Sequence, residues 1–358
     1  MERESREVVL QPFQMEILPI RTLLLFNFEK APDEIYRSLE LQYLVTEKVE
    51  GYRMIAYRND DYVDIYDEVI FEMEGDCKVC GKGMKHFRKV SFSNPYFELT
   101  STGIRAGFGF EDYKGRQIEV CLEEHSRRKT KPFDMIAPVG LSSEKPTSFP
   151  AFAMYDFDFA RRRHTEVSIV IDGKTMKPDL FPVPVPKDGQ MRSFIRYGMD
   201  CELVEFGKTK QTVLTPVPCK ENRLEQGNLV TEVKENEGEY QIHVLRFAQS
   251  KHRFEVIFED GFPDLLRMED GVKTGAYSIQ MEESIGFIGG RFQVRKKQDI
   301  VHIELNFAEG WVRKNKEVFE KLLFNKKAVF ATWPKTYHYK QEINLSTGKT
   351  KAKWERKI

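Results

Sequence analysis

Residues 104–124 read IRAGFGFEDYKGRQIEVCLEE, and this stretch decides the fold class. Apolar residues stand at positions 106, 108 and 110 before the corner Asp112–Gly115 and at positions 118, 120 and 122 after it. Alternation with a period of two places one face of a strand in a core and the other in water. The stretch therefore predicts two antiparallel strands joined by a tight turn.

Similar corners recur along the whole chain, spaced roughly eight to twelve residues apart. They include Asp172–Gly173, Asp260–Gly261, Asp270–Gly271 and Thr347–Gly348. Gly and Asp tolerate the positive φ angles that tight hairpins require. The sequence thus predicts an almost all-β protein, built mainly from antiparallel meanders.

Two short helices are expected to interrupt these meanders. The first begins at Pro32, which suits the first turn of a helix, and Ile35, Leu39 and Tyr43 would form its apolar stripe. The second covers about residues 314–325, where apolar pairs recur four positions apart.

The chain of 358 residues is too long for one ordinary core, so we expect two units. The proline-rich run at 182–186 cannot be a central strand, because each proline removes a ladder donor. We place the boundary there, giving domains 9–187 and 188–358. Each is a β-barrel or a β-sandwich. Lipocalin-like tandem barrels are the favoured architecture, because closure removes exposed edges.

The composition argues against several classes of partner. Lys+Arg and Asp+Glu are equal at 56 each, whereas a nucleic-acid binder usually shows a basic excess. The longest apolar run near the start, Leu23–Phe26, is far short of a membrane span. Five cysteines, an odd number, favour reduced thiols and a cytoplasmic protein. The Gly-Lys-Thr tripeptides lack the earlier glycine of a phosphate loop, so no cofactor is predicted.

Cys77 and Cys80 resemble one half of a zinc knuckle, and His86 could supply a third ligand. Structural zinc requires four ligands, and no second pair of this spacing exists. A turn that contains two thiols is the favoured interpretation, so no metal is predicted.

The segment 149–159 is the most unusual in the chain. On a strand, Asp156 and Asp158 would share one face about 6.6 Å apart, close to an arginine cluster and His164. These three residues are the candidate catalytic acids and bases. The alternative is a pair of solvent-facing acids that neighbouring arginines neutralise.

We expect the chain to bind a small, mostly apolar or amphipathic molecule in a β-enclosed cavity. One alternative is an enzyme of isomerase, hydratase or cyclase type on the same scaffold, with glycan hydrolysis as a lesser variant. Another is a structural or protein-interaction role. The other histidines, including His252, are interpreted as surface or core residues. The expected ligand-binding residues are Phe152, Tyr155, Arg162, Trp311, Trp333, Tyr337 and His338.

Overall fold

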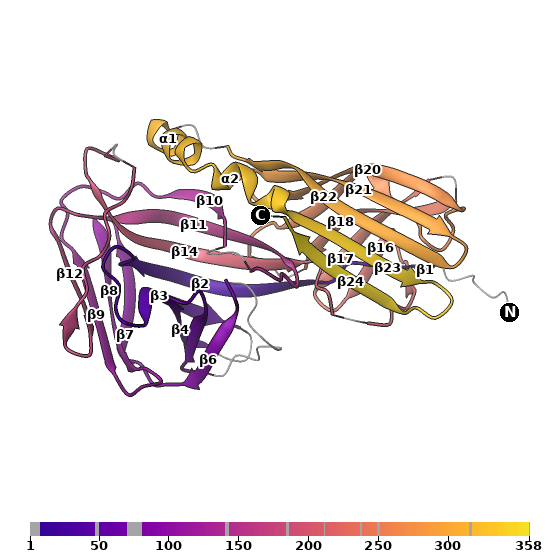
Figure 1. Cartoon of the computed structure of the whole chain (residues 1–358). Helices are drawn as coiled ribbons and strands as arrows, with labels where there is room; N and C mark the ends of the chain where they lie inside the picture. The colour runs from indigo at the N-terminus through magenta and orange to yellow at the C-terminus, as the bar shows by residue number, and fades with distance from the viewer. Residues whose placement is uncertain are drawn as a thin grey trace.

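The computed structural model describes residues 8–46, 50–69, 81–139, 143–183, 186–210, 212–236, 238–248, 251–314 and 317–357. It confirms the mainly antiparallel β class. Figure 1 shows the earlier strands, indigo to pink, beside a unit of orange and yellow strands from the end of the chain. Within the described residues, no helix has the length and apolar character needed to cross a membrane.

An eight-stranded sheet runs through the first unit in the order β10-β11-β14-β2-β3-β4-β5-β6. Neighbouring strands are antiparallel except for β5 and β6, which are parallel. The strands are β2 (Met15–Asn27), β3 (Tyr36–Val45), β4 (Glu50–Arg58), β5 (Val63–Asp67), β6 (Met84–Lys89), β10 (Phe133–Ala137), β11 (Phe149–Arg161) and β14 (Arg192–Phe206). Although β14 follows the expected boundary, it pairs with β11 and β2. The division into 9–187 and 188–358 stays a prediction.

A five-stranded sheet covers one face of this large sheet, in the order β13-β12-β9-β8-β7. Its strands are β7 (Ser93–Thr100), β8 (Gly103–Glu111), β9 (Gln117–Glu124), β12 (Thr165–Ile171) and β13 (Lys174–Thr175). The hairpin expected from residues 104–124 is confirmed, with Phe108 opposite Val120. Between the two sheets lies one apolar core, to which Leu24, Phe26 and Leu39 contribute from the large sheet.

The second unit is a nine-stranded antiparallel meander from β16 to β24. Its strands are β16 (Arg223–Gln226), β17 (Leu229–Asn236), β18 (Glu239–Phe247), β19 (Glu255–Phe262), β20 (Gly271–Gln280), β21 (Phe287–Lys297), β22 (Ile300–Val312), β23 (Tyr337–Asn344) and β24 (Thr350–Arg356). A small sheet pairs β1 (Val8–Val9) with β15 (Val217–Pro218). The helix expected near 314–325 is confirmed as α1 (Val318–Lys326), and α2 (Val329–Thr332) and a 3₁₀ turn, η1 (Pro334–Thr336), follow it.

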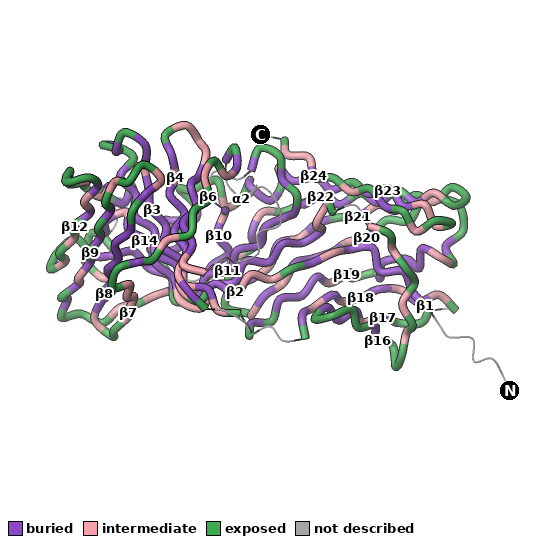
Figure 2. The backbone as a smooth tube through the Cα atoms, turned by 90° about the horizontal axis from the view of Figure 1, so that it is seen from below, coloured by how far each residue is buried: buried purple, intermediate pink, exposed green. Residues whose placement is uncertain are grey.

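The two units share a second, larger apolar core. Phe149 at the start of β11 stacks on Trp333, with ring centroids 5.1 Å apart, and also contacts Phe307 of β22 at 4.2 Å. The strand pairings among the described residues form open sheets, so the tandem barrels are not confirmed. Exposed residues are concentrated on strands such as β6 and β7 at the edges of the sheets, whereas the residues of β2, β11 and β14 are mostly buried (Figure 2).

Two local predictions were wrong. The helix expected after Pro32 is instead strand β3, where Leu39 faces the core and Glu40 on the opposite face is also buried. The corner expected at Asp260–Gly261 lies inside β19, at a shift in its register with β18. Gly261 has a φ of 78°, which identifies a bulge instead of a turn.

Candidate functional site

A β-bulge separates the two candidate catalytic aspartates. The register between β11 and β14 shifts from Tyr155 to Asp158, and Asp156 takes a positive φ of 48°. A bulge adds one residue and breaks the alternation of the strand. Asp156 is consequently exposed, whereas Asp158 is 1% exposed, so the expectation that both carboxylates share a face was wrong.

Asp158 sits among buried cations. Its carboxylate lies 3.3 Å from Lys187 Nζ and 3.7 Å from Arg192 Nε, and it accepts a hydrogen bond from the backbone N–H of Phe159. Burial raises the pKa of Asp158, and the two cations act in the opposite direction. His164 lies apart from it in an exposed turn. The structure does not bring the three residues together, and their catalytic role stays a prediction.

The five aromatic residues of the expected ligand site lie in the core that the two units share. These residues are Phe152, Tyr155, Trp311, Trp333 and Tyr337. Trp333 and Tyr337 meet with ring centroids 6.4 Å apart, and Trp311 packs against Phe324 of α1. Arg162 is exposed, and His338 contacts Asn306 on the outside of β23. The seven residues therefore do not surround one point.

Tyr155 instead stacks on His252, with ring centroids 3.6 Å apart. His252 was expected at the surface but is only 8% exposed, and its Nδ1 lies 3.1 Å from Glu282 Oε1. The hydroxyl of Tyr155 is buried without a hydrogen-bond partner among the described residues. Burial, followed by the charge of Glu282, raises the pKa of Tyr155.

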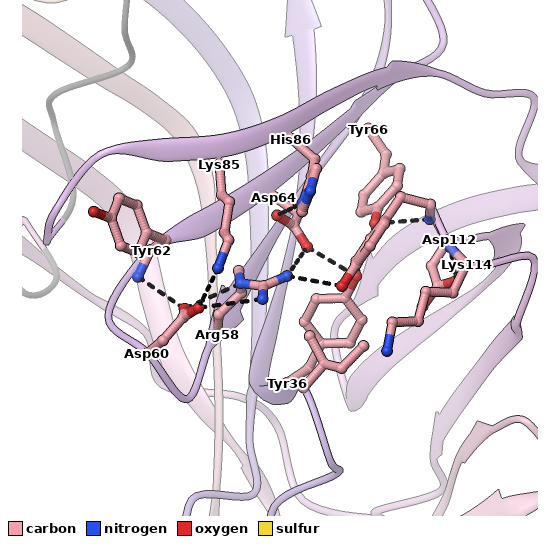
Figure 3. Close-up of polar contacts among 12 residues, drawn as sticks. Tyr36, Arg58, Asp60, Tyr62, Asp64, Tyr66, Lys85, His86, Asp112 and Lys114 are labelled. Atoms are coloured by element: carbon pink, nitrogen blue, oxygen red, sulfur yellow. Dashed lines mark hydrogen bonds and ion pairs between the residues drawn. The ribbon is translucent and has the colours of Figure 1, made fainter.

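A dense polar cluster, which we call the Asp64 cluster, lies on strands β3 to β6 (Figure 3). Asp64 is fully buried and accepts hydrogen bonds from Arg58 Nη1 at 2.8 Å and from the Tyr36 hydroxyl at 3.1 Å. Its second oxygen lies 2.8 Å from His86 Nδ1. The hydroxyls of Tyr36 and Tyr66 are 2.7 Å apart, and burial raises the pKa of both phenols.

The Asp64 cluster joins the two sheets of the first unit. The backbone N–H of Tyr113, in the corner between β8 and β9, donates to the Tyr66 hydroxyl at 3.2 Å. The ring of Tyr113 stacks on His86 with centroids 4.0 Å apart. Because these polar groups hydrogen-bond to one another, the cluster is best explained as a structural link between the two sheets.

Cys77 and Cys80, the half zinc knuckle, lie outside the described residues. His86, considered as a third ligand, binds Asp64 through Nδ1. In the part of the chain that the structure describes, no group of three or more His, Cys, Asp or Glu side chains is arranged to hold a metal ion.

A hollow of about 470 Å³ opens in the second unit over β16 to β19. Its walls carry cationic and anionic side chains, among them Arg223, Lys234, Glu221 and Glu259. All four of these residues are exposed. Water can solvate such charges, so this hollow has no buried group that requires a ligand. It differs from the apolar cavity that the sequence predicts.

The strongest candidate site lies on the face of the eight-stranded sheet turned away from the five-stranded sheet. Residues directly opposite one another on neighbouring strands form a row on this face, which we call the Arg196 row. The row comprises Phe159, Arg196, Leu25, Glu40, Ile55 and Ile65. Most of its members are apolar, as expected for a buried face, but Arg196 and Glu40 are charged.

Arg196 is incompletely paired. Its Nη2 donates to Asn27 Oδ1 at 2.7 Å, and its guanidinium lies 4.7 Å from the ring centroid of Phe194. Among the described residues it makes no ion pair, and its buried Nε has no hydrogen-bond partner. Burial lowers the pKa of Arg196, and the largest opposing influence is the charge of Glu40.

Glu40 is 6% exposed and also lacks an ion pair among the described residues. It accepts hydrogen bonds from the Tyr57 hydroxyl at 2.6 Å and from Gln42 Nε2 at 2.7 Å. Burial raises the pKa of Glu40, against the influence of these two donors and of Arg196. Charges buried without an ion pair are rare and are concentrated at functional sites.

No protein-family model, curated protein or solved structure matches this chain.

Solvent reaches the Arg196 row at Arg196 itself, whereas the other five members of the row are 1–9% exposed. Arg196 and Phe194 are half-buried although β14 is a central strand, and Tyr57 on β4 is half-buried as well. The sequence reasoning missed Arg196 and Glu40. Glu40 stands between Leu39 and Leu41, which is the ordinary alternation of a strand with one wet face. Only the pairing of distant strands places it beside Arg196.

Proposed function

We propose that this chain binds a small, mostly apolar or amphipathic ligand against the Arg196 row. The observation that carries the proposal is the guanidinium of Arg196, whose buried Nε has no hydrogen-bond partner among the described residues, on an otherwise largely apolar face. Leu25, Ile55 and Phe159 would contact the apolar body of the ligand. Arg196 would bind its polar group and so recover the hydrogen bond that its Nε lacks.

This proposal does not require closed, lipocalin-like barrels. We place the binding in the cytoplasm, supported by the reduced thiols of Cys121 and Cys201. The alternative is an enzyme that uses Asp156, Asp158 or His164. It is less well supported, because Asp156 is exposed to solvent, Asp158 is held in a buried ion pair and His164 lies in an exposed turn.

Fluorescence titration with 11-(dansylamino)undecanoic acid tests the proposal on the full chain. We expect saturable binding, and we expect Arg196→Met to weaken it about tenfold, since one charge-assisted hydrogen bond is lost. The matched control is Arg162→Met, because Arg162 is exposed and was the arginine expected from the sequence to orient the ligand. It should leave the affinity unchanged.

Two outcomes would contradict the proposal. Absence of saturable binding would remove the ligand-binding function. Weaker binding in Arg162→Met with unchanged binding in Arg196→Met would move the site to the turn after β11. Circular dichroism of each variant separates loss of affinity from loss of the fold.

A further inference from the structure

The chemical class of the ligand follows from the two charged members of the Arg196 row, provided that the proposed function holds. Arg196 and Glu40 lie on β14 and β3, and β2 runs between them. Leu25 of β2 is directly opposite both residues, so all three side chains project from the same face. Two strand spacings separate the two charged residues, which corresponds to about 10 Å between their Cα atoms.

The two groups call for different partners. The Arg196 guanidinium can only donate hydrogen bonds, and it is matched best by a carboxylate. Glu40 already accepts from Tyr57 and Gln42, and its carboxylate retains lone pairs for one further donor. A hydroxyl can donate to this carboxylate and can also accept from it if the group is protonated.

The side chain between the two groups is apolar. Leu25 separates Arg196 from Glu40, and Ile55 continues the row beyond Glu40. Placing a polar group of the ligand over Leu25 would desolvate it without a partner, which is unfavourable. The polar groups of the ligand should therefore lie at the two ends of an apolar segment.

We propose that the ligand is a two-headed amphiphile. Its carboxylate pairs with Arg196, its hydroxyl binds Glu40, and a saturated chain or ring system between them lies across Leu25. A molecule with a single polar head would leave either Arg196 or Glu40 without a polar contact to the ligand.

Isothermal titration calorimetry with three probes tests this inference on the full chain. The probes are 8-hydroxyoctanoate, octanoate and 1-octanol, and the first of these has polar ends that match a spacing of about 10 Å. We expect 8-hydroxyoctanoate to bind at least about tenfold more tightly than either single-headed probe, because each head gains a charge-assisted hydrogen bond.

Two variants test which residue binds the carboxylate of the ligand and which binds its hydroxyl. Arg196→Met should remove the advantage of 8-hydroxyoctanoate over 1-octanol, and Glu40→Met should remove its advantage over octanoate. Glu40→Gln, which keeps the shape and one acceptor, serves as a second variant in case Glu40→Met fails to fold. It should reduce the advantage over octanoate without abolishing it. Arg162→Met should preserve both advantages.

The failures can be told apart. If octanoate or 1-octanol binds as tightly as 8-hydroxyoctanoate, the chain binds amphiphiles but the two-headed class is wrong. If none of the three probes and no dansylated acid binds, the proposed function itself fails, and this inference fails with it.

Discussion

Trp354 Nε1 donates a hydrogen bond to the backbone carbonyl of Gly207 at 2.7 Å. Gly207 directly follows β14, the longest strand of the eight-stranded sheet, whereas Trp354 belongs to β24, the last strand of the chain. Gly207 has a φ of 66°, and a Cβ atom there would lie 3.1 Å from Trp354 Cζ2. The contact fastens the second unit to the first at a position that favours glycine for two separate reasons.

Gly207→Ala should therefore lower the free energy of unfolding by about 1–3 kcal/mol, measured by urea denaturation. Gly227→Ala is the matched control, since Gly227 has a φ of 60° and a Cβ there would have no atom within 4 Å. Gly227→Ala should therefore show the cost of backbone strain without any crowding. Equal losses in the two variants would show that crowding against Trp354 contributes nothing.

Arg58 binds two aspartates that differ in burial, and they should differ in energy. Its Nη1 lies 2.8 Å from Asp64, whose side chain is 0% exposed, and its Nε lies 3.0 Å from Asp60, whose side chain is 39% exposed. Asp64→Asn removes the buried carboxylate and leaves Arg58 with the more exposed Asp60 as its charged partner. It should lower the free energy of unfolding by about 3–5 kcal/mol. Asp60→Asn should lower it by less than about 1 kcal/mol. Urea denaturation of both variants tests this difference, and similar losses would show that burial does not govern the energetics of this cluster.

The strands that sequence reasoning located most accurately have one wet face. In β9, Ile118, Val120 and Leu122 are buried and their neighbours toward the start of the strand are exposed, so the period of two is visible in the letters. Strand β3 is buried on both faces and loses this pattern. Its apolar residues Leu39 and Tyr43 stand four positions apart, and four is compatible with a helix and with one face of a strand. A helix was therefore predicted where the packing of two sheets produces a strand.

The site was less predictable because it depends on register between distant segments. The bulge that turns Asp156 away from Asp158 contains no glycine that would indicate it in the sequence. Aspartate itself tolerates the positive φ that this position requires. Arg196 and Glu40 meet on one face only because β2 pairs with both β14 and β3. No local pattern encodes that pairing, so the sequence directed attention to the aromatic residues of the core instead.

The burial of Glu40 predicts a specific dependence of stability on pH. Burial raises the pKa of Glu40, against the effect of Tyr57, Gln42 and Arg196, above the value of about 4.3 found in unfolded chains. Between the unfolded and folded values the native protein binds more protons, so its stability falls as the pH rises through that window. Glu40→Gln removes this loss.

The free energy of unfolding of Glu40→Gln, relative to that of the wild type without ligand, should thus be higher at pH 8 than at pH 5. Urea denaturation at the two pH values measures the difference. The control is Glu98→Gln, because the side chain of Glu98 is 60% exposed. A Glu40→Gln variant whose stability relative to the wild type does not change with pH would show that Glu40 is charged as readily in the native protein as in the unfolded chain.

The hydroxyls of Tyr155 and Tyr57 should respond oppositely to removal. The Tyr155 hydroxyl has no hydrogen-bond partner among the described residues, so Tyr155→Phe should leave the free energy of unfolding unchanged or raise it by up to about 1 kcal/mol. The stacking on His252 is kept in this variant. Tyr57→Phe deletes the donor 2.6 Å from Glu40 and should lower the stability by about 1–3 kcal/mol, because a buried acceptor loses its partner. Thermal and urea denaturation of the pair compare the two. A substantial loss in Tyr155→Phe would mean that its hydroxyl is hydrogen-bonded in solution, and the ring beside His252 would then have to be reassigned as part of a polar site.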